Sequence, residues 1–259
     1  MPDLIKPVND AINKWRNAAY KLQKSFRLGD KSAVCEGDSW FQHPLESDII
    51  EELIFPNNSY RIYSLAGAGD ELADMLGKGE FVPAIKQEKP DIFLFSGGGN
   101  DVIAKRLRGM VCKPSTPSSD PRAYVVPAQI DGEMAWLATQ VTQVYRQAQS
   151  AKRNLPMFMH GYDYAVPGKK YRFLGLEWNL GDTLDEVGVP KARQYAVVQI
   201  LIDRFNETLV QLATTLQHFH YVDLRGTLQK KDFVDELHPS SEAAAWLAAK
   251  MHRAIRKVV

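Results

Sequence analysis

Short apolar runs alternate with longer runs of helical spacing along most of the chain. Five of the short runs are bounded by turn residues, and we expect them to be β-strands: 33–36, 60–65, 91–95, 155–160 and 219–224. Their apolar residues do not alternate strictly with polar ones, which is typical of strands covered on both faces of a sheet. The pattern therefore predicts a five-stranded, mostly parallel sheet.

Between these strands, apolar residues recur every three or four positions, as they do along one face of an α-helix. One such helix is marked by Ile130, Met134, Leu137, Val141 and Val144, and another by Val198, Leu201, Phe205, Leu209, Leu212 and Leu216. A last helix is expected after Pro239. Strands that alternate with helices indicate βαβ units, so the expected fold class is α/β, a three-layer α/β/α sandwich. Ligands of such folds meet the carboxyl ends of the strands.

An amphipathic helix is expected before the first strand, because apolar residues there follow helical spacing. These residues are Ile12, Trp15, Ala19, Leu22 and Phe26. Neither an internal repeat nor a linker-like segment divides the rest of the chain. We therefore expect residues 1–30 to form a helical extension that packs on one domain of residues 31–259.

Two stretches interrupt the regular pattern. Residues 111–128 contain four prolines among serines and a threonine and are expected to form an exposed loop. Residues 161–189 contain five glycines and several aromatic residues, and they follow a strand end directly. This second stretch is therefore placed to wall or cover a site at that end of the sheet.

The composition is that of a globular protein, since 45% of the 259 residues are hydrophobic and 24% are charged. The formal net charge of +1, from 32 basic and 31 acidic residues, provides no overall field for binding nucleic acid. No run approaches the roughly 20 apolar residues of a membrane span, and the N-terminus lacks the apolar segment of a secretion signal. Two cysteines, Cys35 and Cys112, do not indicate a disulfide framework, so we expect a cytoplasmic location.

Residues that can carry chemistry follow three of the predicted strands. The first strand runs into Gly37-Asp38-Ser39, the second into AGAGD at 66–70, and the third into SGGGND at 96–101. A fourth segment, DELHP at 235–239, precedes the last helix. Each segment alone is a weak signal, but their joint occurrence in this order, at strand ends or a helix start, is strong.

In that order the four segments resemble the SGNH hydrolases, also called GDSL esterases and lipases. The resemblance runs from about residue 33 to the C-terminus and implies a flavodoxin-like α/β/α fold. It also implies roles for five residues: Ser39 as the nucleophile, Gly69 and Asn100 as the oxyanion glycine and asparagine, and Asp235 with His238 as the acid–base pair.

The chain departs from the family pattern in two places. Trp40 stands where leucine is common. The segment around Gly69 lacks the asparagine often found upstream and offers two glycines, so Gly67 is the alternative oxyanion donor. Gly37 is expected to let the strand turn sharply and so expose Ser39.

The residue types support the same chemistry on their own. A serine hydroxyl is a poor nucleophile until a base removes its proton, and the base works better when a third group fixes its tautomer. Ser39 provides the hydroxyl, His238 the base, and Asp235 the group that holds the imidazole. Pro239 disfavours helical geometry at His238, which should therefore lie just before the last helix.

Attack on an ester produces an oxyanion that needs hydrogen-bond donors already in place. The candidates are the N–H groups of Ser39 and Gly69 and the side-chain amide of Asn100. A simpler interpretation of Asn100 and Asp101 is an N-cap pair, because both residue types cap helices well. For Ser39 and Asp235, the simpler interpretations are a turn residue and a solvated surface carboxylate.

Candidates for the substrate pocket are Trp40, His160, Tyr162 and Trp178. His160 and Asp163 stand three apart in the reverse order to the acid–base pair, so we expect them to line the pocket or to be structural. The aromatic residues from Tyr162 to Trp178 fit a hydrophobic cap under a long loop equally well.

Three further histidines have simpler interpretations than a chemical role. His43, next to Pro44, is expected in a turn before the next helix. His218 and His220 with Asp223 invite a metal site, but no fourth ligand is suggested, so no metal is predicted.

The sequence therefore predicts a carboxylic ester hydrolase that works through an acyl-serine and needs no metal or organic cofactor. Its expected partner is a small-molecule ester, without nucleic acid or an integral membrane segment. An O-acyltransferase that uses the same residues and a catalytically silent binding module on the same fold are the alternatives. The acyl chain, the alcohol and the oligomeric state do not follow from these residues.

Overall fold

A five-stranded sheet forms the centre of the molecule, of which the computed structural model describes residues 2–55, 60–169 and 179–259. The strands are β1 (Lys31–Glu36), β2 (Tyr60–Ser64), β3 (Ile92–Phe95), β4 (Met157–His160) and β5 (Phe219–Val222). Their order is β2-β1-β3-β4-β5, and each neighbouring pair is parallel. The predicted strands and parallel sheet are confirmed, in the order of flavodoxin-like folds.

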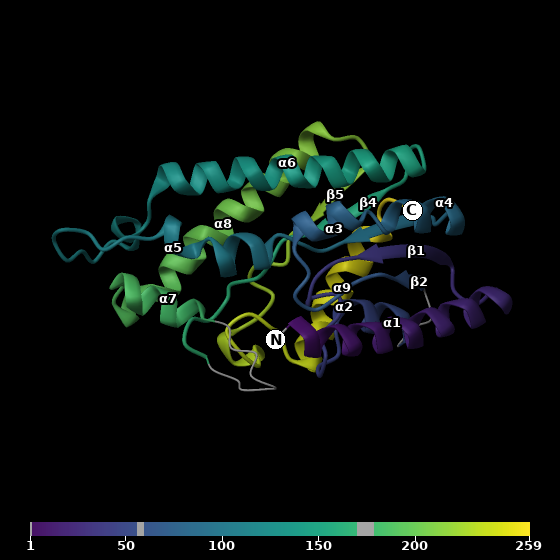
Figure 1. The fold of residues 1–259 in the computed structure, drawn as a ribbon, viewed down its shortest axis with the longest axis horizontal. Helices are drawn as coiled ribbons and strands as arrows, with labels where there is room; N and C mark the ends of the chain where they lie inside the picture. The colour runs from purple at the N-terminus through teal and green to yellow at the C-terminus, as the bar shows by residue number, and fades with distance from the viewer. Residues whose placement is uncertain (1, 56–59, 170–178) are drawn as a thin grey trace.

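Helices cover both faces of this sheet (Figure 1). One face carries α3 (Leu72–Lys78), α4 (Phe81–Glu88), α6 (Pro127–Ala151) and α8 (Lys191–Thr215), and the other carries α2 (Ile49–Ile54) and α9 (Ser241–Ile255). Shorter elements connect them: a π-helix η1 (Gly99–Lys105), α5 (Leu107–Met110), the 3₁₀ turn η2 (Pro121–Tyr124), α7 (Leu180–Val187) and the 3₁₀ turn η3 (Lys230–Asp232). The three helical patterns of the sequence lie in α6, α8 and α9, which confirms the three-layer α/β/α fold.

The strand order creates a crevice at the carboxyl end of the sheet. The chain passes from β1 to β2 on one side of β1 and then returns to β3 on the other side. Loops that leave β1 and β3 therefore diverge, and ligands of such sheets bind at the point of divergence. Ser39 follows β1 and Asn100 follows β3, so both lie at this point.

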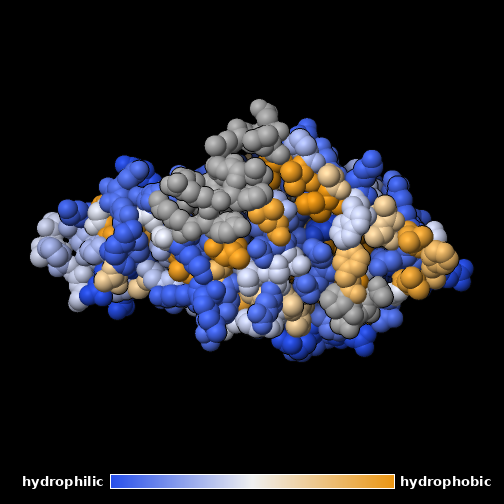
Figure 2. Space-filling model, turned by 90° about the horizontal axis from the view of Figure 1, so that it is seen from below, coloured by the Kyte–Doolittle hydropathy of each residue, from blue (hydrophilic) through white to orange (hydrophobic). Residues whose placement is uncertain are grey.

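Helix α1 (Pro2–Ser25) packs along the edge strand β2. The helix is confirmed, but three residues of its predicted apolar face point outward: Trp15, Leu22 and Phe26 are 51%, 60% and 67% exposed, whereas Arg16 is buried. Figure 2 views this side of the molecule and shows hydrophobic side chains at its right-hand end. The packed face is polar because an edge strand presents unpaired N–H and C=O groups that need polar partners. Among the described residues no helix, α1 included, is long and apolar enough to cross a membrane.

The two irregular stretches contain more structure than predicted. Val111 and Val125 pair in an antiparallel bridge and Tyr124 is buried, so residues 111–128 are not simply an exposed loop. Helix α7 forms near the end of residues 161–189.

Candidate active site

Residues 37–41 bring Ser39 to the carboxyl end of the sheet directly after β1, and we call them the nucleophile turn after the role expected of Ser39. A Cβ atom at Gly37 would lie 2.7 Å from the Cβ of Ser96 at the end of β3. Gly37 is therefore needed for the close approach of two strand ends, not for a special backbone angle. Only 6% of Ser39 is exposed, so the expectation that Gly37 displays the serine openly is wrong.

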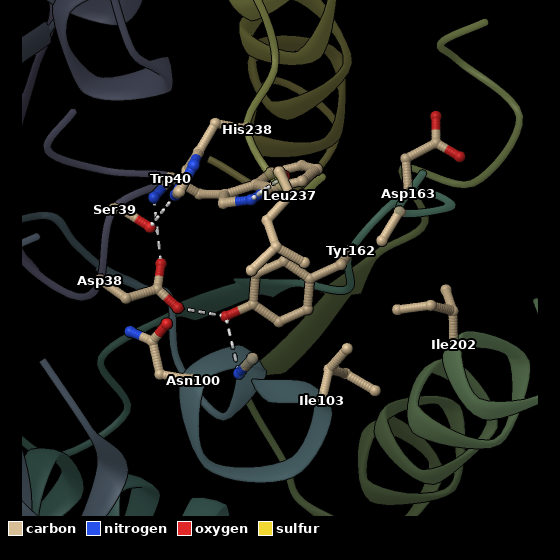
Figure 3. Close-up of a pocket in the computed structure, with 12 residues that line it drawn as sticks. Asp38, Ser39, Trp40, Asn100, Ile103, Tyr162, Asp163, Ile202, Leu237 and His238 are labelled. Atoms are coloured by element: carbon tan, nitrogen blue, oxygen red, sulfur yellow. Dashed lines mark hydrogen bonds between the residues drawn. The ribbon is translucent and has the colours of Figure 1, made fainter. Parts of the chain in front are cut away.

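A chain of hydrogen bonds runs from Ser39 through His238 to Asp235 (Figure 3 shows its first two members). Ser39 Oγ lies 2.8 Å from His238 Nε2, and His238 Nδ1 lies 2.7 Å from Asp235 Oδ2. Burial would raise the pKa of Asp235, but the bonds from the His238 ring and from the N–H groups of Leu237 and His238 hold that pKa below its usual value. An ionised Asp235 requires Nδ1 to carry the proton, so Nε2 accepts the hydrogen of the Ser39 hydroxyl.

The segment that carries His238 ends before α9, as Pro239 predicts. The N–H of Val234 donates to the carbonyl of His238 at 2.8 Å, and Phe233 pairs with Pro239 in an antiparallel bridge. Helix α9 begins only at Ser241. The histidine is thus held in a short, bonded loop, with Asp235 on the same loop.

A hollow lies beside Ser39 and has largely apolar walls. These walls include Trp40, Ile103, Tyr162, Ile202 and Leu237. His160 is fully buried and stacks on Trp40 with ring centroids 5.5 Å apart, so it supports the wall from behind and does not line the hollow. Trp178, the fourth predicted pocket residue, lies outside the described residues.

Asn100, on η1, also lines the hollow. Its Nδ2 donates to the carbonyl of Asp70 at 3.0 Å, which ties it to the segment after β2. There Gly69 adopts a φ of +86°, and its N–H has no acceptor among the described residues. The N–H of Gly67 instead donates to the carbonyl of Gly37 at 2.8 Å. Gly69 therefore offers the available donor, from a position just outside the lining of the hollow.

Asp38, to which the sequence analysis gave no role, joins three strand ends. Its carboxylate accepts hydrogen bonds from the N–H of Trp40 at 3.1 Å, the hydroxyl of Ser96 at 2.7 Å and the hydroxyl of Tyr162 (Figure 3 shows Tyr162). Burial, with the charge of Asp38 adding to it, raises the pKa of Tyr162 and keeps its hydroxyl a donor. The sequence did contain a signal for this role of Asp38. An acidic residue that follows a buried strand closely needs hydrogen-bond donors around its carboxylate.

His43 lies in a turn as expected, and it also packs against His238. The two ring centroids are 4.8 Å apart. His43 Nδ1 accepts the N–H groups of Leu45 and Glu46 at 3.3 and 2.9 Å. Burial, with repulsion from His238, lowers the pKa of His43 to about 3. It is therefore a neutral neighbour whose acceptor nitrogen is already occupied.

The other singled-out carboxylates have structural partners. Asp101 accepts the N–H of Leu72 at 3.0 Å and so bonds the first turn of α3 instead of its own helix, and burial raises the pKa of Asp101 to about 6. Asp163 accepts the N–H groups of Gly226 and Leu228, both at 2.8 Å. Within residues 2–55, 60–169 and 179–259, no group of three or more His, Cys, Asp or Glu side chains is placed to hold a metal ion.

Solved structures with the same fold include lipases and esterases. An extracellular lipase from Streptomyces rimosus superposes with a TM-score of 0.58 at 16% identity, over 87% of this chain and 100% of that one. A phospholipase A1 from Streptomyces albidoflavus NA297 gives 0.55 at 14% identity, over 86% and 99%. A family 3 carbohydrate esterase from Clostridium thermocellum gives 0.52 at 13% identity, over 88% and 96%. At these identities the likeness shows the fold alone.

Sequence comparison defines the family. No curated protein sequence matches this chain. The model of the GDSL-like lipase/acylhydrolase family, however, matches residues 37–251. This match begins at the nucleophile turn, ends within α9 and leaves α1 outside. The chain therefore belongs to the GDSL-like lipase/acylhydrolase family.

Proposed function

We propose that the protein hydrolyses carboxylic esters through an acyl-serine formed on Ser39. The observation that carries this proposal is the continuous hydrogen-bond chain from Ser39 through His238 to Asp235, with links of 2.8 and 2.7 Å. Membership of a family of lipases and acylhydrolases supports an ester as the substrate.

In the acylation step, Ser39 Oγ attacks the carbonyl carbon of the ester while its proton passes to His238 Nε2. The electron pair of the C=O bond moves to oxygen and then returns, which breaks the bond to the alcohol. The departing alcohol takes the proton from His238. Asp235 stays ionised and stabilises the imidazolium. Deacylation repeats these steps with water in place of the serine, releases the carboxylic acid and regenerates Ser39.

Three donors would stabilise the oxyanion of each tetrahedral intermediate: the N–H groups of Ser39 and Gly69 and Nδ2 of Asn100. Within the described part of the chain, neither N–H has another acceptor. An amide nitrogen carries two hydrogens. Asn100 donates one to the carbonyl of Asp70 and keeps the second for the substrate.

Labelling with a fluorophosphonate probe tests the proposal, with intact mass as the readout. We expect one adduct on the wild type and on Ser150→Ala, an exposed serine of α6, and none on Ser39→Ala. Labelling that survives Ser39→Ala would show that the wrong serine was chosen. No labelling of folded wild type would instead support a silent binding module.

Turnover then defines the reaction. The apolar walls of the hollow lead us to expect hydrolysis of p-nitrophenyl esters, and a series from acetate to palmitate measures the acyl length that fits. The same residues could deliver the acyl group to an alcohol. Product analysis with an added alcohol separates the two activities, because a hydrolase gives mainly the free acid.

A further inference from the structure

Helix α1 lies outside the family match, yet its polar face is bonded to the segment that carries Gly69. Asparagines spaced four residues apart on α1 bond to alternate residues of the extended chain that begins in β2. The pairs are Asn17 with Ser64, Asn13 with Ala66 and Asn9 with Ala68, at 2.7–3.1 Å. We call these three pairs the asparagine ladder.

The ladder takes the place of a sixth strand. On the inner side, the N–H groups of Leu65 and Gly67 donate to the carbonyls of Cys35 and Gly37. The intervening even-numbered residues bond to the asparagines on the outer side. Four helical residues rise about 6 Å and two extended residues span about 6.6 Å, so the two repeats stay in register over three pairs.

The last pair of the ladder fixes a particular peptide plane. Asn9 Nδ2 donates to the carbonyl of Ala68 at 3.1 Å, and Asn9 Oδ1 accepts the N–H of Ala68 at 3.1 Å. The carbonyl of Ala68 and the N–H of Gly69 belong to one planar trans peptide and point in opposite directions. Holding that carbonyl toward α1 therefore directs the N–H of Gly69 away from α1.

Asn9 also bonds to the chain that follows the nucleophile turn. Gln42, which is fully buried, donates from Nε2 to Asn9 Oδ1 at 3.2 Å. One asparagine thus connects the segment that carries Gly69 with the segment that carries Ser39.

We propose that Asn9 is a positioning residue for ester hydrolysis, which aims the N–H of Gly69 at the oxyanion by holding the carbonyl of Ala68. The inference rests on the proposed function and adds to it a residue outside the family match. Asn17 makes the same pair of bonds to Ser64, five residues before Gly69, and so has no influence on the direction of this N–H.

The test compares Asn9→Ala with its control Asn17→Ala. Each removes two ladder bonds, and Asn9→Ala also removes the bond from Gln42, which Asn9→Asp keeps. Loss of one oxyanion donor typically lowers kcat by ~10²–10³. A misdirected donor should therefore lower kcat by about tenfold to a hundredfold in Asn9→Ala, with KM within about twofold of wild type. Asn17→Ala should keep kcat within about twofold, although its melting temperature should also fall. Equal kcat values in the two variants would overturn the proposal.

Two further measurements keep the test decisive. If Asn9→Ala does not fold, Asn9→Asp and Asn17→Asp form the same comparison, because aspartate keeps the acceptor and loses the donor to the carbonyl. Amide hydrogen exchange is independent of activity: Asn9→Ala should speed exchange at Ala68 and not at Ser64. Unchanged exchange at Ala68 would show that Asn9 does not hold this peptide and would overturn the inference. An inactive wild type with the expected exchange would overturn only the proposed function.

Discussion

The nucleophile turn and the segment that carries Gly69 follow neighbouring strands, at the same carboxyl end of the sheet. The two are held in place in different ways. The turn follows the inner strand β1, and Ser96 and Tyr162 of the domain donate hydrogen bonds to its Asp38. Helix α1 adds one bond, from Arg16 to the carbonyl of Phe41 at 2.8 Å. The Gly69 segment follows the edge strand β2 and has a strand on one side only. Its other side is bonded to α1 through Asn9. An edge strand can thus position a reacting group only if another element completes it.

The boundary of the family match separates the partners of Asp38 from α1. Asp38, Ser96 and Tyr162 lie within residues 37–251, whereas all of α1 precedes them. The carboxylate of Asp38, next to the proposed nucleophile, is therefore held by residues inside the family match, and the proposed oxyanion glycine by a helix before it.

The largest effect is expected from the hydrogen-bond chain itself. Ser39→Ala and His238→Ala should each lower kcat by roughly 10⁶, because residues that act as one unit fail together. For the same reason the double variant should be no slower than either single variant. Initial rates on a p-nitrophenyl ester measure all three. Additive losses would show that the two residues do not work as a unit.

The next largest effect is expected at Asn100, the donor that lines the hollow. Asn100→Ala should lower kcat by ~10²–10³ with little change in KM, because the bond to the oxyanion forms only in the transition state. This loss should exceed that of Asn9→Ala, since Asn100 donates directly and Asn9 only directs another donor. A loss below tenfold in Asn100→Ala would remove Asn100 from the proposed oxyanion site.

The sequence predicted those features that depend on local pattern. The unbroken apolar run Ile92–Phe95 predicts a strand covered on both faces, and β3 is buried along its whole length. The motifs at Ser39 and His238 lie at a strand end and just before a helix, where the order of the elements predicts them. Each of these inferences needs only neighbouring residues and the general topology of α/β folds.

Features that depend on distant contacts were missed. The spacing of Trp15, Leu22 and Phe26 shows which residues share a face of α1, but not which face meets the sheet. That choice is made by β2, whose open edge requires polar partners. The bond between Asp38 and Tyr162 likewise joins residues 124 positions apart, which no local pattern reveals.

A smaller effect on turnover is expected when one hydrogen bond that supports the nucleophile turn is removed. Tyr162→Phe removes one of the donors to the buried carboxylate of Asp38, and such a loss costs about 1–3 kcal/mol of unfolding free energy. Trp40 and Ser96 still bond to Asp38, so kcat should fall by less than about tenfold.

Tyr221→Phe is the matched control for this change. The hydroxyl of Tyr221 donates to Asn206 Oδ1 at 2.5 Å, and neither residue lines the hollow. Urea unfolding should show both variants destabilised, with kcat lowered only in Tyr162→Phe. A Tyr162→Phe variant as stable as the wild type would contradict the role of Asp38 as the anchor of the turn.

The smallest effect on kcat is expected at Glu36, which links the two regions and whose substitution changes stability. Glu36 ends β1, is 3% exposed, and has its pKa raised well above 4.5 by burial and by the charges of Asp70 and Glu80. Folded protein therefore keeps a proton that unfolded protein loses as the pH rises above 4.5. The stability of the wild type should fall as the pH rises toward the folded pKa, and Glu36→Gln should not share that fall.

Urea unfolding between pH 4 and 9 measures this difference. The advantage of Glu36→Gln over wild type should grow by about 1.4 kcal/mol per pH unit above 4.5 and level off once the folded pKa is passed. Glu88→Gln is the opposite control, because bonds from Lys24 and Tyr20 outweigh burial and lower the pKa of Glu88. Its stability relative to wild type should decline with rising pH only below about 4.5 and should stay constant above it. A stability advantage of Glu36→Gln that is the same at every pH would show that Glu36 is ionised in the folded protein. A buried charge would then lie where β1 meets the segment that carries Gly69.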